Sequence, residues 1–553
     1  MKRLLYLALL SLAFAPALAW ADAASDLQAG VDAQNRGDSD AAIQYYTTAL
    51  QEGGLSDTNM EVAYYNRGMV YQDKGELSQA IADYTEAIRL KPDDFDPYNN
   101  RGFVYTDQGQ YEQALSDLDE AIRLAPGDYK AYYNRGRAYI GKGDYPKAIA
   151  DNTEALRLKP DLALGYNNRG LAYEDNGQYD EAIADLTESI RLDPNGALAY
   201  NNRGMAYTDK GQYDLGIADE NDALRLDPNN YQSYYNRGRA YANKGEYDKA
   251  IADNTKVLEL KPDFYLAYQN RGYSYLNNDD YDKAIADENE ALRLSPDDLD
   301  ARYNRACAYD GKQQYDQAIA DYTEILRASP DYMLAYFRRG DDYDDKGKYD
   351  LAIADHTAAL KLKPDYVYAH VNRGVSYEHS GQHDLAIADY TAALKLKPTD
   401  VYAFRGRGRT YFYKGNYKES VADFDRALAI SAQDQDALIW RYLAQTKAGG
   451  DGKTPLKAAT AKLTGKYWPR PIIDHFLGTV TKDQVMVAAK NQDAVTQASQ
   501  ECDADAYVAE DELLHQRKAA AMTLLQQAKI ECALGGTERS LVMLELQRAE
   551  KSP

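Results

Sequence analysis

The sequence predicts an all-α protein built as an array of helical hairpins, and three observations lead to this fold class. A period of 34 residues returns without insertion from residue 58 to residue 434. Within each period, a small residue and a Tyr recur in the first half and a small residue recurs in the second half. A Pro stands near the end of all but the last period. A fixed period of this length is typical of stacked helical units that bury their faces against their neighbours.

Each period has the pattern of two helices joined by a tight turn. We number the units from 1 to 34 so that the Gly of the recurring triplet Asn-Arg-Gly is position 8. Positions 4, 8 and 11 then share one helical face, and positions 20, 24 and 27 share another. Gly at position 15 permits the turn, and Pro at position 32 ends the second helical region. At position 24 we expect looser packing in the five units that carry a polar residue there: Asn152, Glu220, Asn254, Glu288 and His356.

An Arg at position 7 and an Asp at position 23 recur in every regular unit, from Arg67 and Asp83 to Arg407 and Asp423. Both positions are equally far from the turn at position 15, so they stand at the same height in a hairpin. We infer an ion pair between the two helices of one unit or between neighbouring units. The same pair in every unit indicates an architectural role, because the pairs cannot all be active sites.

The residues at these positions resemble the tetratricopeptide repeat (TPR) family, whose pattern has an aromatic residue at 4, Gly at 8, Tyr at 11, Ala at 20 and 27, and Pro at 32. The resemblance implies a right-handed superhelical solenoid of about twelve TPR hairpins with a concave inner surface. We expect a degenerate first unit over residues 22–57 and eleven regular units over residues 58–434. A small helical C-terminal domain is expected over residues 435–553.

Asn at position 6 is the candidate binding residue. In the TPR family, positions 2, 6, 9 and 13 of the first helix line the concave groove. An Asn side chain has one acceptor and two donors, so it can bind the polar groups of a peptide backbone. Neighbouring helices pack about 8–10 Å apart and an extended peptide advances about 3.3 Å per residue, so one Asn would meet about every third peptide residue. The predicted peptide-binding residues are Asn66, Asn100, Asn134, Asn168, Asn202, Asn236, Asn270, Asn304 and Asn372.

This series resembles the asparagine ladder in the superhelix of O-linked N-acetylglucosamine transferases. The alternative interpretation is a solvated helix position with a mild structural use, since Asn is also frequent at position 6 in the TPR family.

Three segments of the last hundred residues carry a second resemblance. They read WPRPIIDHFLG (468–478), QASQECDADAYVAEDELL (497–514) and QAKIECALGGTERSLVMLELQRA (527–549). These segments resemble the end of new-lipoprotein-I-type TPR proteins, which serve as adaptors for envelope proteases and cell-wall hydrolases. This chain departs from that type because it has no lipidation cysteine and carries far more repeats.

The first 21 residues have the pattern of a signal peptide. Lys2 and Arg3 precede an apolar run over residues 4–15, and Ala-x-Ala sites follow, with cleavage expected after Ala21. The apolar run is shorter than the roughly 20 residues that span a bilayer. We therefore expect an exported, soluble, periplasmic protein without a membrane span.

The chain contains three cysteines, and an odd count in an exported protein suggests one pair and one cysteine left over. We expect a disulfide between Cys502 and Cys532 that joins two helices of the terminal domain, with Cys307 free. The alternative is that Cys502 and Cys532 are small buried residues.

Composition and motifs argue against several function classes. The formal net charge of −23 disfavours nucleic-acid binding, because an acidic chain repels phosphate backbones. His379 and His383 have a chelating spacing, but Gly381 at the turn position splits them between two helices. We expect no catalytic residues, no metal and no cofactor.

These observations favour a non-enzymatic scaffold or adaptor that binds extended segments of other proteins in a concave groove. In this interpretation it recruits cell-envelope proteases or hydrolases. One alternative is an accessory component of envelope polysaccharide export or secretion, and another is the targeting arm of an envelope hydrolase. The sequence leaves the oligomeric state and the identity of the bound protein open.

Overall fold

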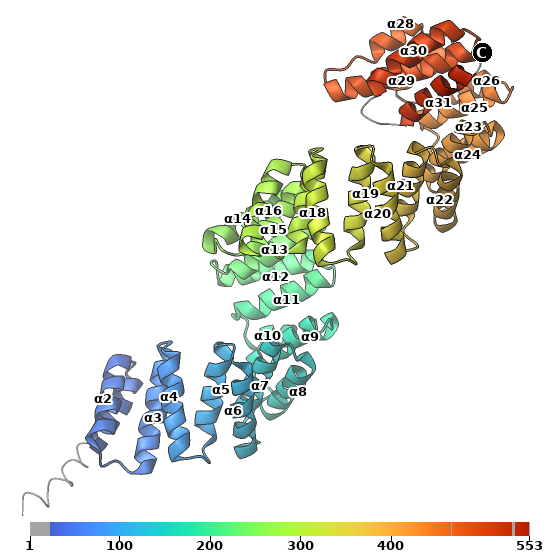
Figure 1. The fold of residues 1–553 in the computed structure, drawn as a ribbon. Coiled ribbons are helices and arrows are strands. Elements are labelled where there is room, and N and C mark those ends of the chain that lie inside the picture. Colours follow the sequence, from blue (N-terminus) through green and yellow to red (C-terminus); the bar gives the residue numbers. More distant parts are fainter. Residues whose placement is uncertain (1–22, 466, 533–536, 552–553) are drawn as a thin grey trace, which may run out of the picture. The chain divides into compact units, whose positions relative to one another are not determined.

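The computed structural model describes residues 23–465, 467–532 and 537–551. Every regular element in these ranges is a helix, which confirms the all-α fold (Figure 1). None of the helices described has the length and apolar character that crossing a membrane requires. The predicted signal peptide and its cleavage after Ala21 lie outside the described residues.

The chain divides into two compact units, one ending at Ser274 and one beginning at Tyr275, and each is described by itself. This border lies inside a helix of the repeat array, whereas the repeat period predicts a domain border at residue 434. Unit 1 begins with a helix over residues 23–35. It continues with α2 (Ser39–Glu52), α3 (Asp57–Asp73), α4 (Leu77–Leu90), α5 (Phe95–Asp107), α6 (Tyr111–Leu124), α7 (Tyr129–Lys142), α8 (Tyr145–Leu158), α9 (Ala163–Asp175), α10 (Tyr179–Leu192), α11 (Ala197–Asp209), α12 (Tyr213–Leu226), α13 (Tyr231–Lys244), α14 (Tyr247–Leu260) and most of α15 (Tyr265–Asn277).

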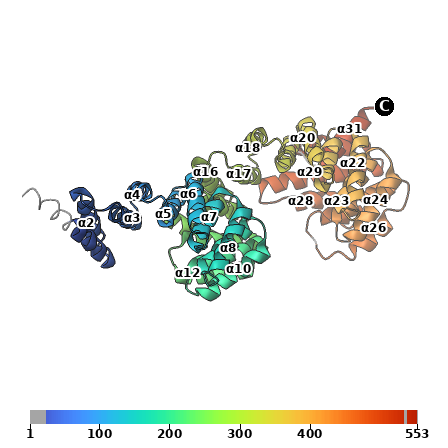
Figure 2. The same cartoon turned by 90° about the horizontal axis from the view of Figure 1, so that it is seen from below.

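Unit 2 contains the remaining repeats and the C-terminal helices. Its helices are α16 (Tyr281–Leu294), α17 (Leu299–Gly311), α18 (Tyr315–Ala328), α19 (Met333–Asp345), α20 (Tyr349–Leu362), α21 (Val367–His379), α22 (His383–Leu396), α23 (Val401–Tyr413), α24 (Tyr417–Ile430), α25 (Gln435–Lys447), α26 (Lys453–Thr460), α27 (Arg470–Phe476), α28 (Lys482–Ala488), α29 (Ala494–Leu514), α30 (Lys518–Glu531) and α31 (Thr537–Lys551). Within a repeat, the first helix lies beside the second, as α3 lies beside α4 (Figure 1, Figure 2).

The turn between the two helices of a repeat requires a left-handed residue at position 15. Gly143 ends α7 with φ +79°, and its N–H donates to the Ile140 carbonyl at 2.9 Å. Asp279 and Gln313 take the same place without being Gly, each with φ +58°. Side chains rarely adopt this region, so these two turns are less favourable than the Gly turns.

Gly at position 8 allows the two helices of a repeat to approach closely. A Cβ added to Gly102 would lie 2.6 Å from Cγ of Leu118, the residue at position 24 of the same unit. A Cβ at Gly136 would lie 2.4 Å from Nδ2 of Asn152, which occupies position 24 of the same unit. The polar residues at position 24 are fully buried like the apolar ones.

The repeat frame extends one helix beyond residue 434. Arg441 on α25 occupies position 7 of a further unit, and its Nε lies 2.5 Å from Oδ1 of Asp425 in the preceding unit. Trp440 of the same helix is almost fully buried, and its ring lies 6.4 Å from that of Phe424 and 5.9 Å from that of Tyr507 on α29. The C-terminal helices therefore pack directly onto the last repeat and share one core with it.

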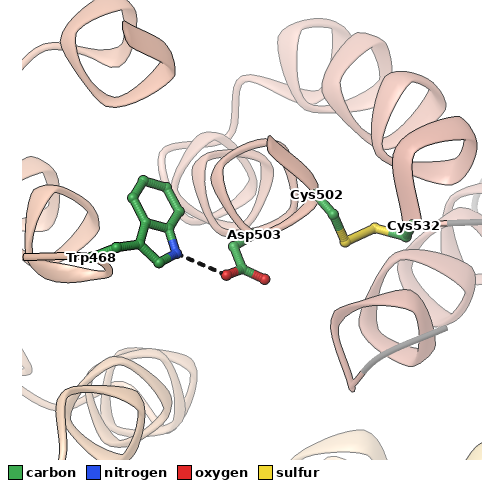
Figure 3. The surroundings of a disulfide bond; sticks show 4 residues. All are labelled: Trp468, Cys502, Asp503 and Cys532. Atoms are coloured by element: carbon green, nitrogen blue, oxygen red, sulfur yellow. Dashed lines mark hydrogen bonds between the residues drawn. A yellow bond between two sulfur atoms is a disulfide. The ribbon is translucent and has the colours of Figure 1, made fainter. Parts of the chain in front are cut away.

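A disulfide joins Cys502 on α29 to Cys532, which follows α30, and Cys307 is free (Figure 3). Next to it, Nε1 of Trp468 donates a hydrogen bond of 2.9 Å to Oδ2 of Asp503 (Figure 3). These two contacts tie α29 to α30 and to the segment that leads into α27.

Candidate functional site

The Arg at position 7 connects three helices of the array. Nε and Nη2 of Arg203 donate to the two carboxylate oxygens of Asp219 at 2.7 and 2.8 Å, within one hairpin. Its third nitrogen, Nη1, donates to Oγ1 of Thr187 in the preceding unit at 3.0 Å. The inferred ion pair is confirmed, and it forms within a unit. The same bidentate pair joins Arg67–Asp83, Arg101–Asp117, Arg135–Asp151, Arg169–Asp185, Arg237–Asp253, Arg305–Asp321, Arg339–Asp355, Arg373–Asp389 and Arg407–Asp423.

The predicted Asn series lies on consecutive first helices, but several of its amides already bind the preceding unit. Nδ2 of Asn134 donates to Oδ1 of Asn99 at 2.9 Å, and Nδ2 of Asn202 donates to Oδ1 of Asn167 at 3.0 Å. In both cases the acceptor is position 5 of the preceding unit. Asn100 makes the equivalent contact with the Tyr65 hydroxyl at 3.2 Å. The amides therefore form bridges between neighbouring first helices, which sequence reasoning did not predict.

The remaining members of the series differ in their surroundings. Asn168 is buried, and its Nδ2 has no hydrogen-bond partner. Asn372 donates to Oδ1 of Asp341 at 2.7 Å. Asn66 faces Tyr46, and Asn270 is half-buried. Asn236 faces the buried Glu220, and Asn304 faces the buried Glu288.

Glu220 shows how a polar residue is accommodated at position 24. Both of its carboxylate oxygens accept hydrogen bonds from Nδ2 of Asn201, at 3.2 and 3.0 Å. The side chain is fully buried, and this burial raises the pKa of Glu220 to about 8 although Asn201 favours the charged form. Position 24 thus places a titratable group in the core beneath the first-helix face.

Two cavities open on the first helices α19, α21 and α23 of unit 2. One, of about 210 Å³, is lined by three Asp of α19 together with His356, Asn372 and Val375. The other, of about 360 Å³, is lined by Asn372, Val375 and residues of α21 to α23 that include three Tyr. A signal for them is present in the segment RRGDDYDDKG (338–347), where Asp occupies positions 9 and 10, which in most units carry apolar or small residues.

Within the ranges that the structure describes, no group of three or more His, Cys, Asp or Glu side chains is arranged to hold a metal ion. His379 ends α21 and His383 begins α22, with Gly381 between them at φ +77°. The predicted separation of these two His residues by the turn is confirmed.

Comparisons with solved structures find helical repeat proteins of low overall similarity. A tetratricopeptide repeat protein from Parabacteroides merdae is 21% identical, with 46% of this chain and 98% of that chain covered and a TM-score of 0.40. The Cut9–Hcn1 hetero-tetramer of the APC/C is 16% identical over 82% of this chain and 96% of that chain, with a TM-score of 0.40. YrrB, described as a TPR protein with an unusual peptide-binding site, is 27% identical over 33% and 95%, with a TM-score of 0.28. No curated protein matches the chain in sequence.

Family models match the repeats directly. A "TPR repeat" model matches residues 68–109, and a "Tetratricopeptide repeat" model matches residues 231–264. A second "Tetratricopeptide repeat" model matches residues 100–163, 167–231, 270–333, 303–341, 337–401 and 380–437, which together make up more than half of the chain. The chain belongs to the tetratricopeptide repeat family.

Proposed function

We propose that this protein is a scaffold that binds extended segments of other proteins along its first helices. The observation that carries the proposal is the series of position-6 amides on consecutive first helices. An Asn amide has two N–H donors and an acceptor, and the bridge to the preceding unit uses one donor of Asn134 and one of Asn202. In this proposal the second N–H of each amide donates to a peptide carbonyl. The repeated spacing suits a backbone whose own polar groups repeat.

Selection from a display library of random, unstructured peptides tests this proposal. We expect the purified full chain to enrich peptides that then bind in calorimetry with a saturable one-to-one isotherm. If no peptide is enriched over a chain-free control, the proposed function is wrong.

The triple variant Asn134→Ala, Asn168→Ala and Asn202→Ala tests the role of the amides. Each change removes about 0.5–1.5 kcal/mol of net hydrogen bonding, so the three together should weaken an enriched peptide by about one to three orders of magnitude. Circular dichroism and melting must show that the variant remains folded. Equal affinity for the folded variant and the wild type would refute the role of the amides.

A matched control changes the second helices of the same three units. The triple variant Glu154→Gln, Glu188→Gln and Asp222→Asn removes surface carboxylates that pair with Arg three residues later. Exposed pairs of this kind contribute little, so peptide affinity should stay within about twofold.

We further propose that the scaffold acts in the periplasm and recruits envelope proteases or hydrolases. The signal-peptide pattern, the disulfide and the resemblance of residues 437–550 to new-lipoprotein-I-type adaptors support this assignment. The intact mass of the protein from a periplasmic fraction should correspond to a chain that begins at Asp22. In vivo crosslinking of that fraction followed by mass spectrometry should recover envelope proteases or hydrolases. A retained Met1, or crosslinks to cytoplasmic proteins alone, would overturn the proposal that the scaffold acts in the periplasm.

A further inference from the structure

The first helix α19 carries an unusual concentration of acid. Its segment RRGDDYDDKG places Asp at positions 9, 10, 12 and 13 of the unit. Position 10 is a small or β-branched uncharged residue in the other regular units, such as Ala308 in the preceding one. Here it is Asp342, which is fully buried. Four carboxylates within five residues repel one another, so this concentration of negative charge destabilises the helix and calls for an explanation in the local structure.

Three of these carboxylates, from Asp341, Asp344 and Asp345, line the cavity of about 210 Å³, which we call the acidic recess. Oδ1 of Asp341 accepts a hydrogen bond of 2.7 Å from Asn372, and Oδ2 of Asp344 lies 3.0 Å from Nδ1 of His379. Oδ1 of Asp344 has no hydrogen-bond partner. The recess therefore retains an unsatisfied carboxylate oxygen.

His356 is an independent indication that the recess lacks a binding partner, because its ring has unsatisfied hydrogen-bonding groups. It lies at position 24 under the recess, is fully buried and belongs to the lining. Neither ring nitrogen has a hydrogen-bond partner, and Nε2 lies 3.7 Å from Oδ1 of Asp341. Burial lowers the pKa of His356 to about 4, so the ring is neutral near pH 7 and does not balance the carboxylates.

The charges around the recess remain poorly balanced. Burial is the main cause that raises the pKa of Asp341 to about 7 and that of Asp345 to about 6. Burial and the neighbouring Asp310 raise the pKa of Asp342 to about 9. The hydrogen bond from Asn372 and the charge of Arg338 oppose the shift of the Asp341 pKa, and a hydrogen bond with Tyr315 opposes that of Asp345, but the pKa values of both carboxyls remain raised. An added cation in the recess would stabilise the ionised carboxylates.

The second cavity, which we call the apolar recess, adjoins the acidic one, because Asn372 and Val375 line both. Tyr368 and Tyr402 stand at its edge with 58% and 72% of their surfaces exposed. Gly406 replaces the usual Asn at position 6, and a Cβ there would lie 2.4 Å from Cζ of Tyr390. Because Gly406 has no side chain, the Tyr390 ring occupies the space next to its Cα.

The charged groups at the apolar recess are already paired. Nε of Arg409 lies 2.8 Å from Oε1 of Glu378, and this buried carboxylate also accepts from Thr410 at 2.8 Å. Arg405 binds Asp436 at 2.7 Å. The recess thus offers aromatic and aliphatic surface to a ligand, together with charges that are satisfied within the protein.

We propose that the two recesses together bind an extended segment of another protein, with a Lys or Arg side chain in the acidic recess and a large aromatic or aliphatic side chain in the apolar recess. This inference rests on the proposed function and specifies the class of segment that unit 2 selects. A cationic side chain fits the uncompensated carboxylates, and the exposed tyrosines provide an apolar contact next to them. Both recesses lie within unit 2.

The distance between neighbouring first helices sets the spacing of the two side chains. Packed helices lie about 8–10 Å apart, and an extended chain advances about 3.3 Å per residue. The basic and the apolar residue should therefore stand about three positions apart in the bound segment.

A synthetic peptide tests the proposal directly. The probe is a fluorescein-labelled, otherwise Gly/Ser peptide that contains Lys-Ser-Gly-Phe, and its binding to the full chain is followed by anisotropy at pH 8. Replacing Lys by Gln, or Phe by Ala, should each weaken binding about tenfold or more, since one buried ionic or aromatic contact contributes at least about that factor. A peptide with Lys and Phe adjacent should bind as weakly as the single replacements.

On the protein side, the isosteric double variant Asp341→Asn and Asp345→Asn should weaken the Lys-Ser-Gly-Phe peptide about tenfold and leave the Gln peptide unchanged. Tyr402→Ala should weaken both. The matched control Asp350→Asn with Asp365→Asn removes two exposed carboxylates of the same region and should change neither. Equal binding of the Lys and Gln peptides to the wild type would overturn the inference.

The experiment separates this inference from the proposed function. If peptides enriched from the random library bind through the Asn series while the Lys-Ser-Gly-Phe peptide does not bind, only the inference about unit 2 is wrong. If neither binds, the proposed function is wrong as well.

Discussion

The pair of Arg203 and Asp219 offers a direct test of what holds a repeat together. Arg203→Ala removes two hydrogen bonds to Asp219 and one to Thr187 in the preceding unit. It leaves the Asp219 carboxylate without its cation. The Arg203 side chain is 17% exposed and that of Asp219 is 8% exposed, so both charges lie mostly within the packed layer.

The expected loss of stability follows from this burial. Removing one partner of a fully buried ion pair costs about 3–5 kcal/mol, because the other charge remains desolvated. Since the Arg203 guanidinium keeps some contact with water, we expect about 2–4 kcal/mol for this hairpin. In an array, such a loss acts on the hairpin and its neighbours.

Hydrogen exchange measured by mass spectrometry resolves this local effect. Amides of α11 and α12 should exchange faster in Arg203→Ala, while amides of α5 and α6 should keep their rates. The control Arg225→Ala on α12 removes a 63% exposed side chain that pairs with Asp222, and its effect should stay within about 0.5 kcal/mol.

The double variant Arg203→Leu with Asp219→Leu decides whether the pair is the cause. An apolar replacement of both partners removes the stranded charge and should restore much of the protection. If the double variant exchanges as fast as the single Arg203→Ala variant, the cost does not come from the stranded carboxylate and the reasoning fails.

Three further changes test the core. Because folding raises the pKa of Glu220 from 4.5 to about 8, the wild type should lose stability as the pH rises from about 4.5 to 8. Glu220→Gln should not show this loss, and chemical denaturation should find the pH-dependent losses of the two proteins between pH 4.5 and pH 8 to differ by at most about 5 kcal/mol. Reducing the Cys502–Cys532 disulfide should destabilise the terminal helices by roughly 3–4 kcal/mol, and peptide mapping without reductant should show the linked peptide. Gly102→Ala should cost about 1–3 kcal/mol in thermal or chemical unfolding, because its Cβ would meet Leu118 at 2.6 Å.

The repeat period determined most of the fold that could be predicted from the sequence. Helix boundaries follow from the alternation of an apolar face, a Gly at position 15 and a Pro at position 32, all of which act locally. The Arg–Asp pair was predictable because two residues equally far from a turn must stand at the same height. The same reasoning missed Arg441, since the period is lost around it while its contact to Asp425 remains.

The candidate site was less predictable because it depends on contacts between units. A helical period places Asn134 and Asn202 on one face of their helices. It does not predict that each amide donates to the Asn at position 5 of the unit before it, Asn99 for Asn134 and Asn167 for Asn202. That distance depends on how neighbouring hairpins are rotated against each other, which the period alone does not determine. The recess that His356 lines depends on the same rotation.

Stability and binding are assigned to different residues of the same helices. The Arg–Asp contacts use positions 7, 23 and 25, and α19 keeps them intact: Arg339 binds Asp355 at 2.7 Å although four Asp follow it closely in the sequence. A hairpin held in this way can tolerate unfavourable groups at positions 9, 10, 12 and 13 without unfolding. Places where a sequence breaks its own pattern at an energetic cost are where function is expected, and in this array α19 is such a place.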